Sequence, residues 1–254
     1  MGVILFVHGM GYSNDRDYWK EWAAPLQLEL ARQGLTLTEE QFGGVYYYDL
    51  VPGPYAGKIP TEDILQIQIL GLKKKATEEL SSLRSPFEKT NIVIGNFVDY
   101  LVDNFGDIFS YLYLSKTHQQ VNERLYEAID QYSEPVILLG YSLGTIVSLC
   151  ALLENRSAAN KIAHLLMLGS PLYWFVQGVA NCVDLSLRPA VGRFTNLAGL
   201  LDIAWPQMVP KILTTLDNNI EYRISFNPIK GHTEYFSQKN SLKAISGEII
   251  KGWF

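Results

Sequence analysis

The stretch Pro135-Val-Ile-Leu-Leu-Gly-Tyr-Ser-Leu-Gly-Thr145 determines how the chain is expected to fold. Its apolar residues end in the pattern G-x-S-x-G, and a second apolar run, Ile146–Leu153, follows directly. This order predicts a buried strand that turns sharply into a helix. Gly140 and Gly144 suit such a bend because side chains there would collide with the neighbouring strand and helix. The turn is expected to expose the Ser142 hydroxyl at the carboxyl end of the strand.

Similar short apolar runs recur along the chain, separated by longer segments with helical periodicity. We predict strands at Val3–Val7, Val45–Leu50, Val136–Leu139, Ile162–Leu168 and Tyr222–Phe226, with a weaker pattern at Arg193–Leu197. We predict helices at Asp15–Arg32, Lys116–Tyr132 and Leu143–Asn155. Alternation of this kind indicates βαβ units. The fold class that follows is α/β, with a doubly wound and mostly parallel sheet.

The alternation is interrupted over residues 52–114. Three prolines open this stretch, and two largely helical segments follow them. In the second segment Asp99, Asp103 and Asp107 form one polar stripe on an otherwise apolar predicted helix. This pattern predicts an amphipathic helix and argues against a membrane span. We therefore predict a helical cap inserted into a single domain that covers residues 1–254. Ordinary crossover helices packed on the sheet are the alternative.

Composition excludes several other classes of protein. Hydrophobic residues make up 48% of the 254 residues and charged residues 19%, which suits a sizeable core and not a disordered chain. A net charge of −5 without a long basic run argues against nucleic acid as the main partner.

The opening run Gly2–Val7 lacks the charged flank of a signal peptide, and we find no transmembrane segment. Cys150 and Cys182 lack metal-ligand spacing and suggest free thiols in a cytoplasmic protein.

A serine hydroxyl is a weak nucleophile unless a base lies beside it. The chain has four histidines. His118 lies in a polar helical stretch and is expected at the surface, and His164 falls inside a strand and is expected in the core. His8 follows the first strand, and His232 follows the last one. Only His232 combines a turn with the carboxyl edge of a sheet strand, so we assign it as the base.

A carboxylate that orients the imidazole should stand between the serine and the histidine in chain order. The candidates are Asp184, Asp202, Asp217 and, less favourably because it opens a strand, Glu221. Asp202 follows a strand-like stretch in an apolar neighbourhood, where a carboxylate stabilises an imidazolium better than it does in open water. We favour Asp202 and leave Asp184 and Asp217 open.

An oxyanion that forms at the serine also needs hydrogen-bond donors. The backbone N–H of Leu143, next to Ser142, is one donor by geometry. The turn His8-Gly9-Met10-Gly11 follows the first strand and offers the N–H of Met10 as a second, because its glycines permit close approach. We interpret His8, with Gly9, as a supporting residue that orients this turn.

These ordered elements resemble the α/β-hydrolase superfamily, in its lipase and esterase-like branch. The resemblance covers most of the chain, and its Gly-Ser-Pro-Leu and Thr-Asn…Asp stretches look like those of lipases related to inositol deacylases. The matching segments are His8-Gly9, Gly140–Gly144, Leu168–Leu172, Asn196–Asp202 and Gly231-His232. The resemblance implies Ser142 as nucleophile, Asp202 as acid and His232 as base. It also implies an N-terminally shortened fold that begins at the family's third strand.

The expected activity is therefore hydrolysis of carboxylic esters through an acyl-enzyme, with a small or lipid-like ester as substrate. It calls for no metal and no organic cofactor. Transient contact with a membrane through the cap is compatible with the amphipathic segment. A thioesterase, acyltransferase, lactonase or amidase would use the same three residues. The alternative from another class is a catalytically silent hydrolase fold that binds a partner.

Overall fold

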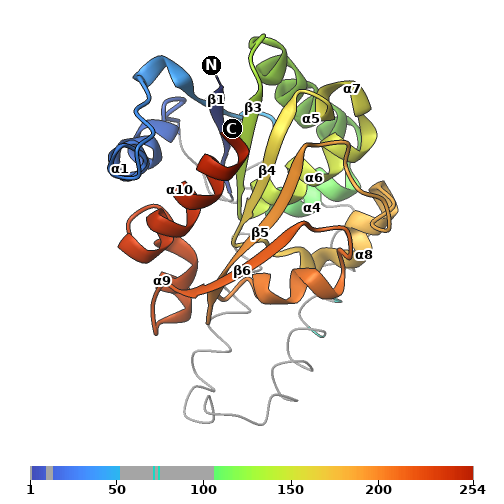
Figure 1. The fold of residues 1–254 in the computed structure, drawn as a ribbon. Helices are drawn as coiled ribbons and strands as arrows, with labels where there is room; N and C mark the ends of the chain where they lie inside the picture. The colour runs from blue at the N-terminus through green and yellow to red at the C-terminus, as the bar shows by residue number, and fades with distance from the viewer. Residues whose placement is uncertain (1, 10–13, 52–70, 72–73, 75–105, 254) are drawn as a thin grey trace.

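One six-stranded sheet organises the part of the chain that the computed structural model describes, residues 2–9, 14–51, 71, 74 and 106–253 (Figure 1). The strands lie in the order β2-β1-β3-β4-β5-β6, and every neighbouring pair is parallel. Their bounds are β1 Val3–Val7, β2 Phe42–Val45, β3 Val136–Tyr141, β4 Ile162–Leu168, β5 Arg193–Leu200 and β6 Asn218–Arg223. The α/β class and the parallel sheet predicted from the sequence are confirmed.

Helices cover both faces of the sheet, as a doubly wound arrangement requires. Their bounds are α1 Trp19–Arg32, α4 Gly106–Tyr113, α5 Ser115–Asp130, α6 Leu143–Glu154, α7 Arg156–Ala159, α8 Leu172–Cys182, α9 Pro228–Thr233 and α10 Lys239–Trp253, with 3₁₀ turns η1 Glu39–Gln41 and η2 Pro206–Lys211. In Figure 1, α1 and α10 lie on one side of the sheet, and α5, α6 and α8 lie on the other.

The hydrophobic core forms two layers because β1 sends alternate side chains to opposite faces. Ile4 and Phe6 pack with α1 and α10, whereas Leu5 and Val7 pack with α5 and α6. Every residue of β1 is buried, and so is nearly all of β3. Burial on both faces explains why these strands read as unbroken apolar runs.

The central strands β3 and β5 begin as predicted and end two and three residues later, whereas the two edge strands, β2 and β6, are displaced from their predicted positions. β2 ends at Val45, where we expected a strand to begin. It contains Gly43 and Gly44, and a Cβ at Gly44 would come within 2.5 Å of the Trp19 ring. β6 begins at Asn218, and its side chains are only partly buried. Both strands are held by backbone pairing and carry no apolar run to mark their bounds.

Most of the predicted cap lies outside the described residues. The part that is described includes α4, whose side chains Ile108, Phe109, Tyr111 and Leu112 are buried in the core layer beside α5 and α8. Among the described residues, none of the helices combines the length and apolar character that a bilayer span needs.

Candidate active site

The chain bends sharply at Ser142, between the end of β3 and the start of α6. Ser142 has φ 51° and ψ −121°, a conformation that is rare for a residue with a side chain. A Cβ at Gly140 would lie 2.8 Å from the carbonyl oxygen of Gly144. A Cβ at Gly144 would overlap the carbonyl oxygen of Val7. The bend is therefore possible only because both flanking residues lack side chains, the reason inferred from the sequence.

His232 contacts Ser142 from a segment 90 residues further along the chain. Its Nε2 lies 2.9 Å from Ser142 Oγ. It belongs to α9, a short helix in place of the turn that we expected. Pro228 opens this helix, and the Asn227 side chain accepts hydrogen bonds from the N–H groups of Ile229 and Lys230. This cap fixes the helix and thereby the position of the imidazole.

Asp202 contacts the other side of the imidazole. Its Oδ1 lies 2.9 Å from His232 Nδ1 and also accepts a hydrogen bond of 2.8 Å from the N–H of Ala204. A carboxylate only accepts, so the Nδ1 proton of His232 points to Asp202, and Nε2 is left to accept from the serine hydroxyl. Asp202 is 1% exposed, and His232 is 6% exposed. Both groups are thus held in a low-dielectric environment, where their interaction is strong.

The other acidic candidates lie elsewhere and have other partners. Asp184 is exposed and accepts from both the N–H and the hydroxyl of Ser186. Asp217 forms an ion pair with Arg188 and accepts from the N–H of Phe194. Of these three aspartates, Asp202 is the one that the structure brings to His232.

His8 is buried after β1, with its ring stacked between two tyrosines. The ring centroids of Tyr47 and Tyr48 lie 3.9 and 3.7 Å from that of His8. Nε2 accepts from the N–H of Tyr47 at 3.1 Å, so Nδ1 carries the proton and donates to the carbonyl oxygen of Gly9 at 2.9 Å. Burial lowers the pKa of His8 to about 3, and the hydrogen bond to Gly9 opposes this only in part. His8 is therefore neutral at pH 7.

Gly9, which follows His8, lies directly against the serine. A Cβ at Gly9 would lie 2.8 Å from Ser142 Cβ, so only glycine fits there without displacing the serine. Leu143, the first residue of α6, is fully buried beside Ser142. Met10, whose N–H we assigned as the second oxyanion donor, lies outside the described residues.

Two tyrosines at the site were not identified from the sequence. The Tyr235 hydroxyl donates to Asp202 Oδ2 at 2.8 Å, and the Tyr141 hydroxyl donates to the carbonyl oxygen of His232 at 2.7 Å. Tyr141 lies at the end of an apolar run and Tyr235 lies in a mostly polar stretch, and neither stretch by itself indicates a hydrogen bond to the acid or the base. The signal that could have found them is their position, one residue before the serine and three residues after the histidine.

The remaining histidines have structural environments. His164 is buried, as expected, and its Nε2 lies 2.8 Å from Thr195 Oγ1. The expectation of a surface position for His118 is wrong, because its side chain is only 15% exposed and its Nε2 lies 2.7 Å from Glu154 Oε1. Burial lowers the pKa of His118, but hydrogen bonds to Cys182 and Glu154 outweigh this effect and raise it to about 10.

Two further observations concern metals and thiols. Cys150 and Cys182 are both free thiols, as expected. Within the described ranges, no cluster of three or more His, Cys, Asp or Glu side chains is arranged to hold a metal ion.

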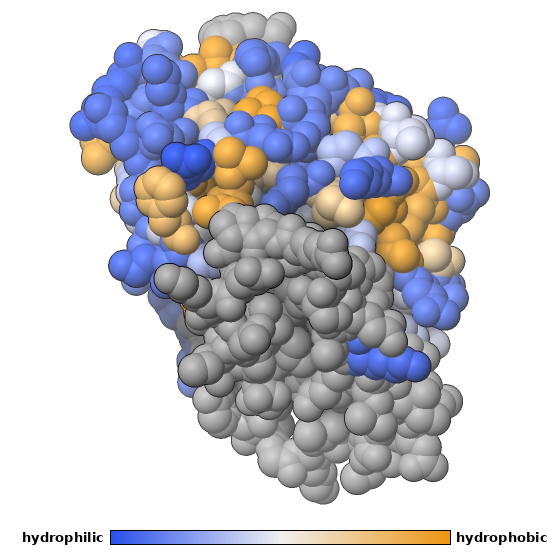
Figure 2. All heavy atoms as spheres, turned by 90° about the horizontal axis from the view of Figure 1, so that it is seen from below, coloured by the Kyte–Doolittle hydropathy of each residue, from blue (hydrophilic) through white to orange (hydrophobic). Residues whose placement is uncertain are grey.

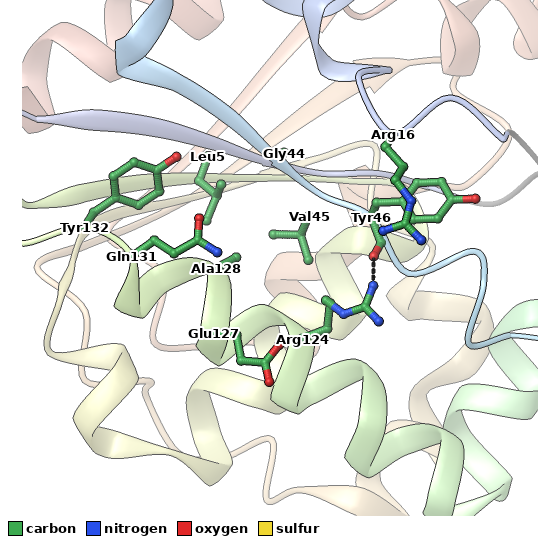
Figure 3. Close-up of a pocket in the computed structure, with 10 residues that line it drawn as sticks. All are labelled: Leu5, Arg16, Gly44, Val45, Tyr46, Arg124, Glu127, Ala128, Gln131 and Tyr132. Carbon is green, nitrogen blue, oxygen red and sulfur yellow. Dashed lines mark hydrogen bonds between the residues drawn. The ribbon is translucent and has the colours of Figure 1, made fainter.

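A cavity of about 210 Å³ lies away from these residues, between β2 and α5 (Figure 3). Arg16 and Arg124 face it, and both guanidinium groups lie within 3.5 Å of the Asp49 carboxylate. Its lining residues are Leu5, Arg16, Gly44, Val45, Tyr46, Arg124, Glu127, Ala128, Gln131 and Tyr132. Ser142, His232 and Asp202 do not line it, so it is separate from the candidate site.

Comparison with known proteins adds no assignment. No family model matches the chain, and no curated protein matches its sequence. The hydrogen bonds that join Ser142, His232 and Asp202 are therefore the main indication of function.

Proposed function

We propose that the protein is a serine hydrolase of the α/β-hydrolase type that cleaves carboxylic esters. The observation that supports this most directly is the continuous hydrogen-bond chain from Ser142 Oγ through His232 to Asp202, with 2.9 Å at each step. A nucleophile beside a base, with the base oriented by a third group, is the arrangement that activates a serine hydroxyl.

In the first half of the reaction, Ser142 Oγ attacks the ester carbonyl carbon while His232 Nε2 takes the hydroxyl proton. Asp202 stays ionised and stabilises the imidazolium that forms. The tetrahedral intermediate then collapses, the bond to the alkoxy oxygen breaks, and His232 returns the proton to the leaving alcohol. An acyl group remains on Ser142.

In the second half, water replaces the alcohol. His232 removes a proton from the water, whose oxygen attacks the acyl carbon, and the carboxylic acid leaves as the proton returns to Ser142 Oγ. Every step uses side chains and backbone groups of this chain.

The oxyanion of each tetrahedral intermediate needs donors that are already in place. The N–H of Leu143 is one, because it belongs to the first turn of α6, whose positive dipole end favours negative charge. The N–H of Met10 stays the predicted second donor. His8 and Gly9 stay the predicted supporting residues, and the His8 ring donates a hydrogen bond to the Gly9 carbonyl oxygen.

We expect the ester to have an apolar portion, because two large apolar side chains are exposed a few residues before His232. Phe226 is 77% exposed and Ile229 is 42% exposed, and both lie in the segment that leads into His232. Figure 2 looks at the molecule from below and shows separate hydrophobic regions among hydrophilic ones on its described part. A helical cap over residues 52–114, and contact of that cap with a membrane, stay predictions.

A fluorophosphonate probe tests the proposal because it reacts covalently with activated serines. Wild-type protein should be labelled at Ser142, as located by peptide mass spectrometry, and Ser142→Ala should not be labelled. Ser148→Ala is the matched control, since Ser148 lies in α6, the helix that Ser142 precedes, and donates only to the Gly144 carbonyl. Equal labelling of wild type and Ser142→Ala, or no labelling of either, would exclude the proposed mechanism.

Substrate class is tested next with para-nitrophenyl esters of graded chain length, alongside the matching thioesters and anilides. Esters should be turned over fastest. Faster turnover of thioesters, or product formation only with an added alcohol, would assign the site to a thioesterase or an acyltransferase instead.

A further inference from the structure

The Tyr235 side chain lies behind the candidate acid, on the side of Asp202 that faces away from His232. Its hydroxyl oxygen is 2.8 Å from Asp202 Oδ2 and 2.7 Å from the backbone nitrogen of Gly199, in β5. The tyrosine is fully buried. The residue thus connects the end of β5, the loop that carries Asp202 and the segment that follows α9.

The direction of both hydrogen bonds is determined by chemistry. A backbone N–H only donates, so the Tyr235 oxygen accepts from Gly199. An ionised carboxylate only accepts, so the one proton of Tyr235 points to Asp202 Oδ2. Burial, together with the charge of Asp202, raises the pKa of Tyr235 well above its ordinary value, and the phenol stays protonated. Hydrogen bonds arranged in such a chain polarise and strengthen one another.

The backbone packs closely around the Tyr235 ring and hydroxyl. A Cβ at Gly169 would lie 2.9 Å from the Tyr235 ring and 3.0 Å from Asp202 Oδ2. A Cβ at Gly199 would lie 3.1 Å from the Tyr235 hydroxyl. Two glycines therefore allow the backbone to close around the phenol and the carboxylate. A buried carboxylate oxygen without this donor would lose its partner where water has little room to replace it.

We propose that Tyr235 is a positioning residue of the Ser142–His232–Asp202 site, whose hydroxyl holds the Asp202 carboxylate in the orientation that accepts the hydrogen bond from His232 Nδ1. The inference rests on the proposed function, because it assigns Tyr235 a role in the same reaction. Tyr235 acts only through Asp202 and touches neither Ser142 nor the reacting atoms.

The test compares Tyr235→Phe with Tyr222→Phe. Both variants lose one phenol hydroxyl from the same aromatic cluster, but Tyr222 is only half-buried, and its hydroxyl pairs with Ser241 Oγ, at 3.1 Å, and not with Asp202. Turnover of a para-nitrophenyl ester is divided by the concentration of competent sites, measured by titration with a fluorophosphonate, so that partly unfolded protein does not count. Tyr235→Phe should lower kcat by about tenfold with KM within twofold of wild type, because the hydrogen bond is made to a charged group. Tyr222→Phe should keep kcat within twofold.

A double-mutant cycle separates positioning through Asp202 from a general effect on packing. In an Asp202→Asn background, adding Tyr235→Phe should change kcat by less than twofold, because the carboxylate on which Tyr235 acts is gone. The same tenfold loss in that background would overturn the inference, as would an unchanged kcat for Tyr235→Phe alone.

The outcomes also separate the inference from the function on which it rests. If the wild type reacts with the probe at Ser142 and Asp202→Asn is impaired while Tyr235→Phe is not, only the role of Tyr235 fails. If the wild type itself shows no reaction that depends on Ser142, the proposed function fails, and the role of Tyr235 fails with it.

Discussion

The hydroxyl of Tyr141 donates a hydrogen bond of 2.7 Å to the backbone carbonyl of His232. The two rings also lie face to face, with centroids 5.4 Å apart and planes inclined by 28°. Tyr141 ends β3 and precedes Ser142 directly. The residue before the serine therefore supports the backbone of the histidine that contacts the serine, so the positions of the two groups are linked.

Removal of that support should slow the reaction without unfolding the protein. We expect Tyr141→Phe to lower kcat by roughly three- to tenfold, in line with the loss of one neutral hydrogen bond. Steady-state ester hydrolysis measures this. Tyr126→Phe is the matched control, because the Tyr126 hydroxyl also donates to a backbone carbonyl, that of Ala151, away from the site. An equal loss in both variants would show that the Tyr141 contact has no special role.

Asp202→Asn should lower ester turnover by roughly 10³–10⁴-fold, because an amide facing Nδ1 favours the wrong tautomer of the imidazole. The decrease should appear in kcat. Asp217→Asn is the comparison: Asp217 pairs with Arg188, so its loss should affect stability and leave turnover near that of wild type. Near-normal turnover in Asp202→Asn would remove Asp202 from the mechanism.

Gly144→Ala should destabilise the fold by about 3 kcal/mol, as expected for overpacking against backbone atoms that cannot move independently. The added Cβ would overlap the carbonyl oxygen of Val7 and come within 2.6 Å of that of His8. Urea unfolding measures the change. Gly247→Ala, in α10, is the opposite case, since its Cβ would meet no atom closer than 4.0 Å. That variant should gain about 0.5–1 kcal/mol from helix propensity.

Stability should fall as the pH drops below 6.5, partly because of two buried neutral histidines. Burial lowers the pKa of His8 to about 3, and burial is also the largest effect on His164, whose pKa is about 4. Below pH 6.5 the unfolded chain takes up protons that the folded chain does not, so this part of the stability is full above pH 6.5 and decreases towards pH 4. Each histidine contributes a slope of roughly 1.4 kcal/mol per pH unit.

The variant His164→Asn tests this contribution. Its free energy of unfolding should depend less steeply on pH between 6 and 4 than that of wild type, by about the slope of one histidine. Unfolding in urea at several pH values provides the comparison. Identical slopes would mean that His164 takes up its proton in the folded state as well.

The central strands could be predicted from the sequence because both of their faces are buried. β1 and β4 have the bounds that their apolar runs indicate. The edge strands could not be placed in the same way. The Gly43-Gly44 pair in β2 and the Asn218-Asn219 pair in β6 contribute backbone hydrogen bonds to the sheet, and backbone pairing leaves no hydrophobic pattern in the sequence.

The residue types at the candidate site could be inferred from local patterns, since each follows the carboxyl end of a strand. The tyrosines that hold them could not. Whether a phenol meets a carboxylate depends on contacts between distant segments, such as the contact between Asp202 and Tyr235, which are 33 residues apart. Chain order alone also left Asp184 and Asp217 open, and their own hydrogen-bond partners distinguish them from Asp202.

The order of the three groups along the chain has a consequence for biosynthesis. During translation Ser142 is synthesised well before His232, which lies 90 residues later in the chain. In the growing polypeptide Ser142 therefore lacks its base at first, and the proposed mechanism predicts that its hydroxyl becomes reactive only when α9 docks at the end of β3. Covalent labelling of Ser142 in nascent chains that are stalled at different lengths would therefore show at which chain length His232 first reaches Ser142.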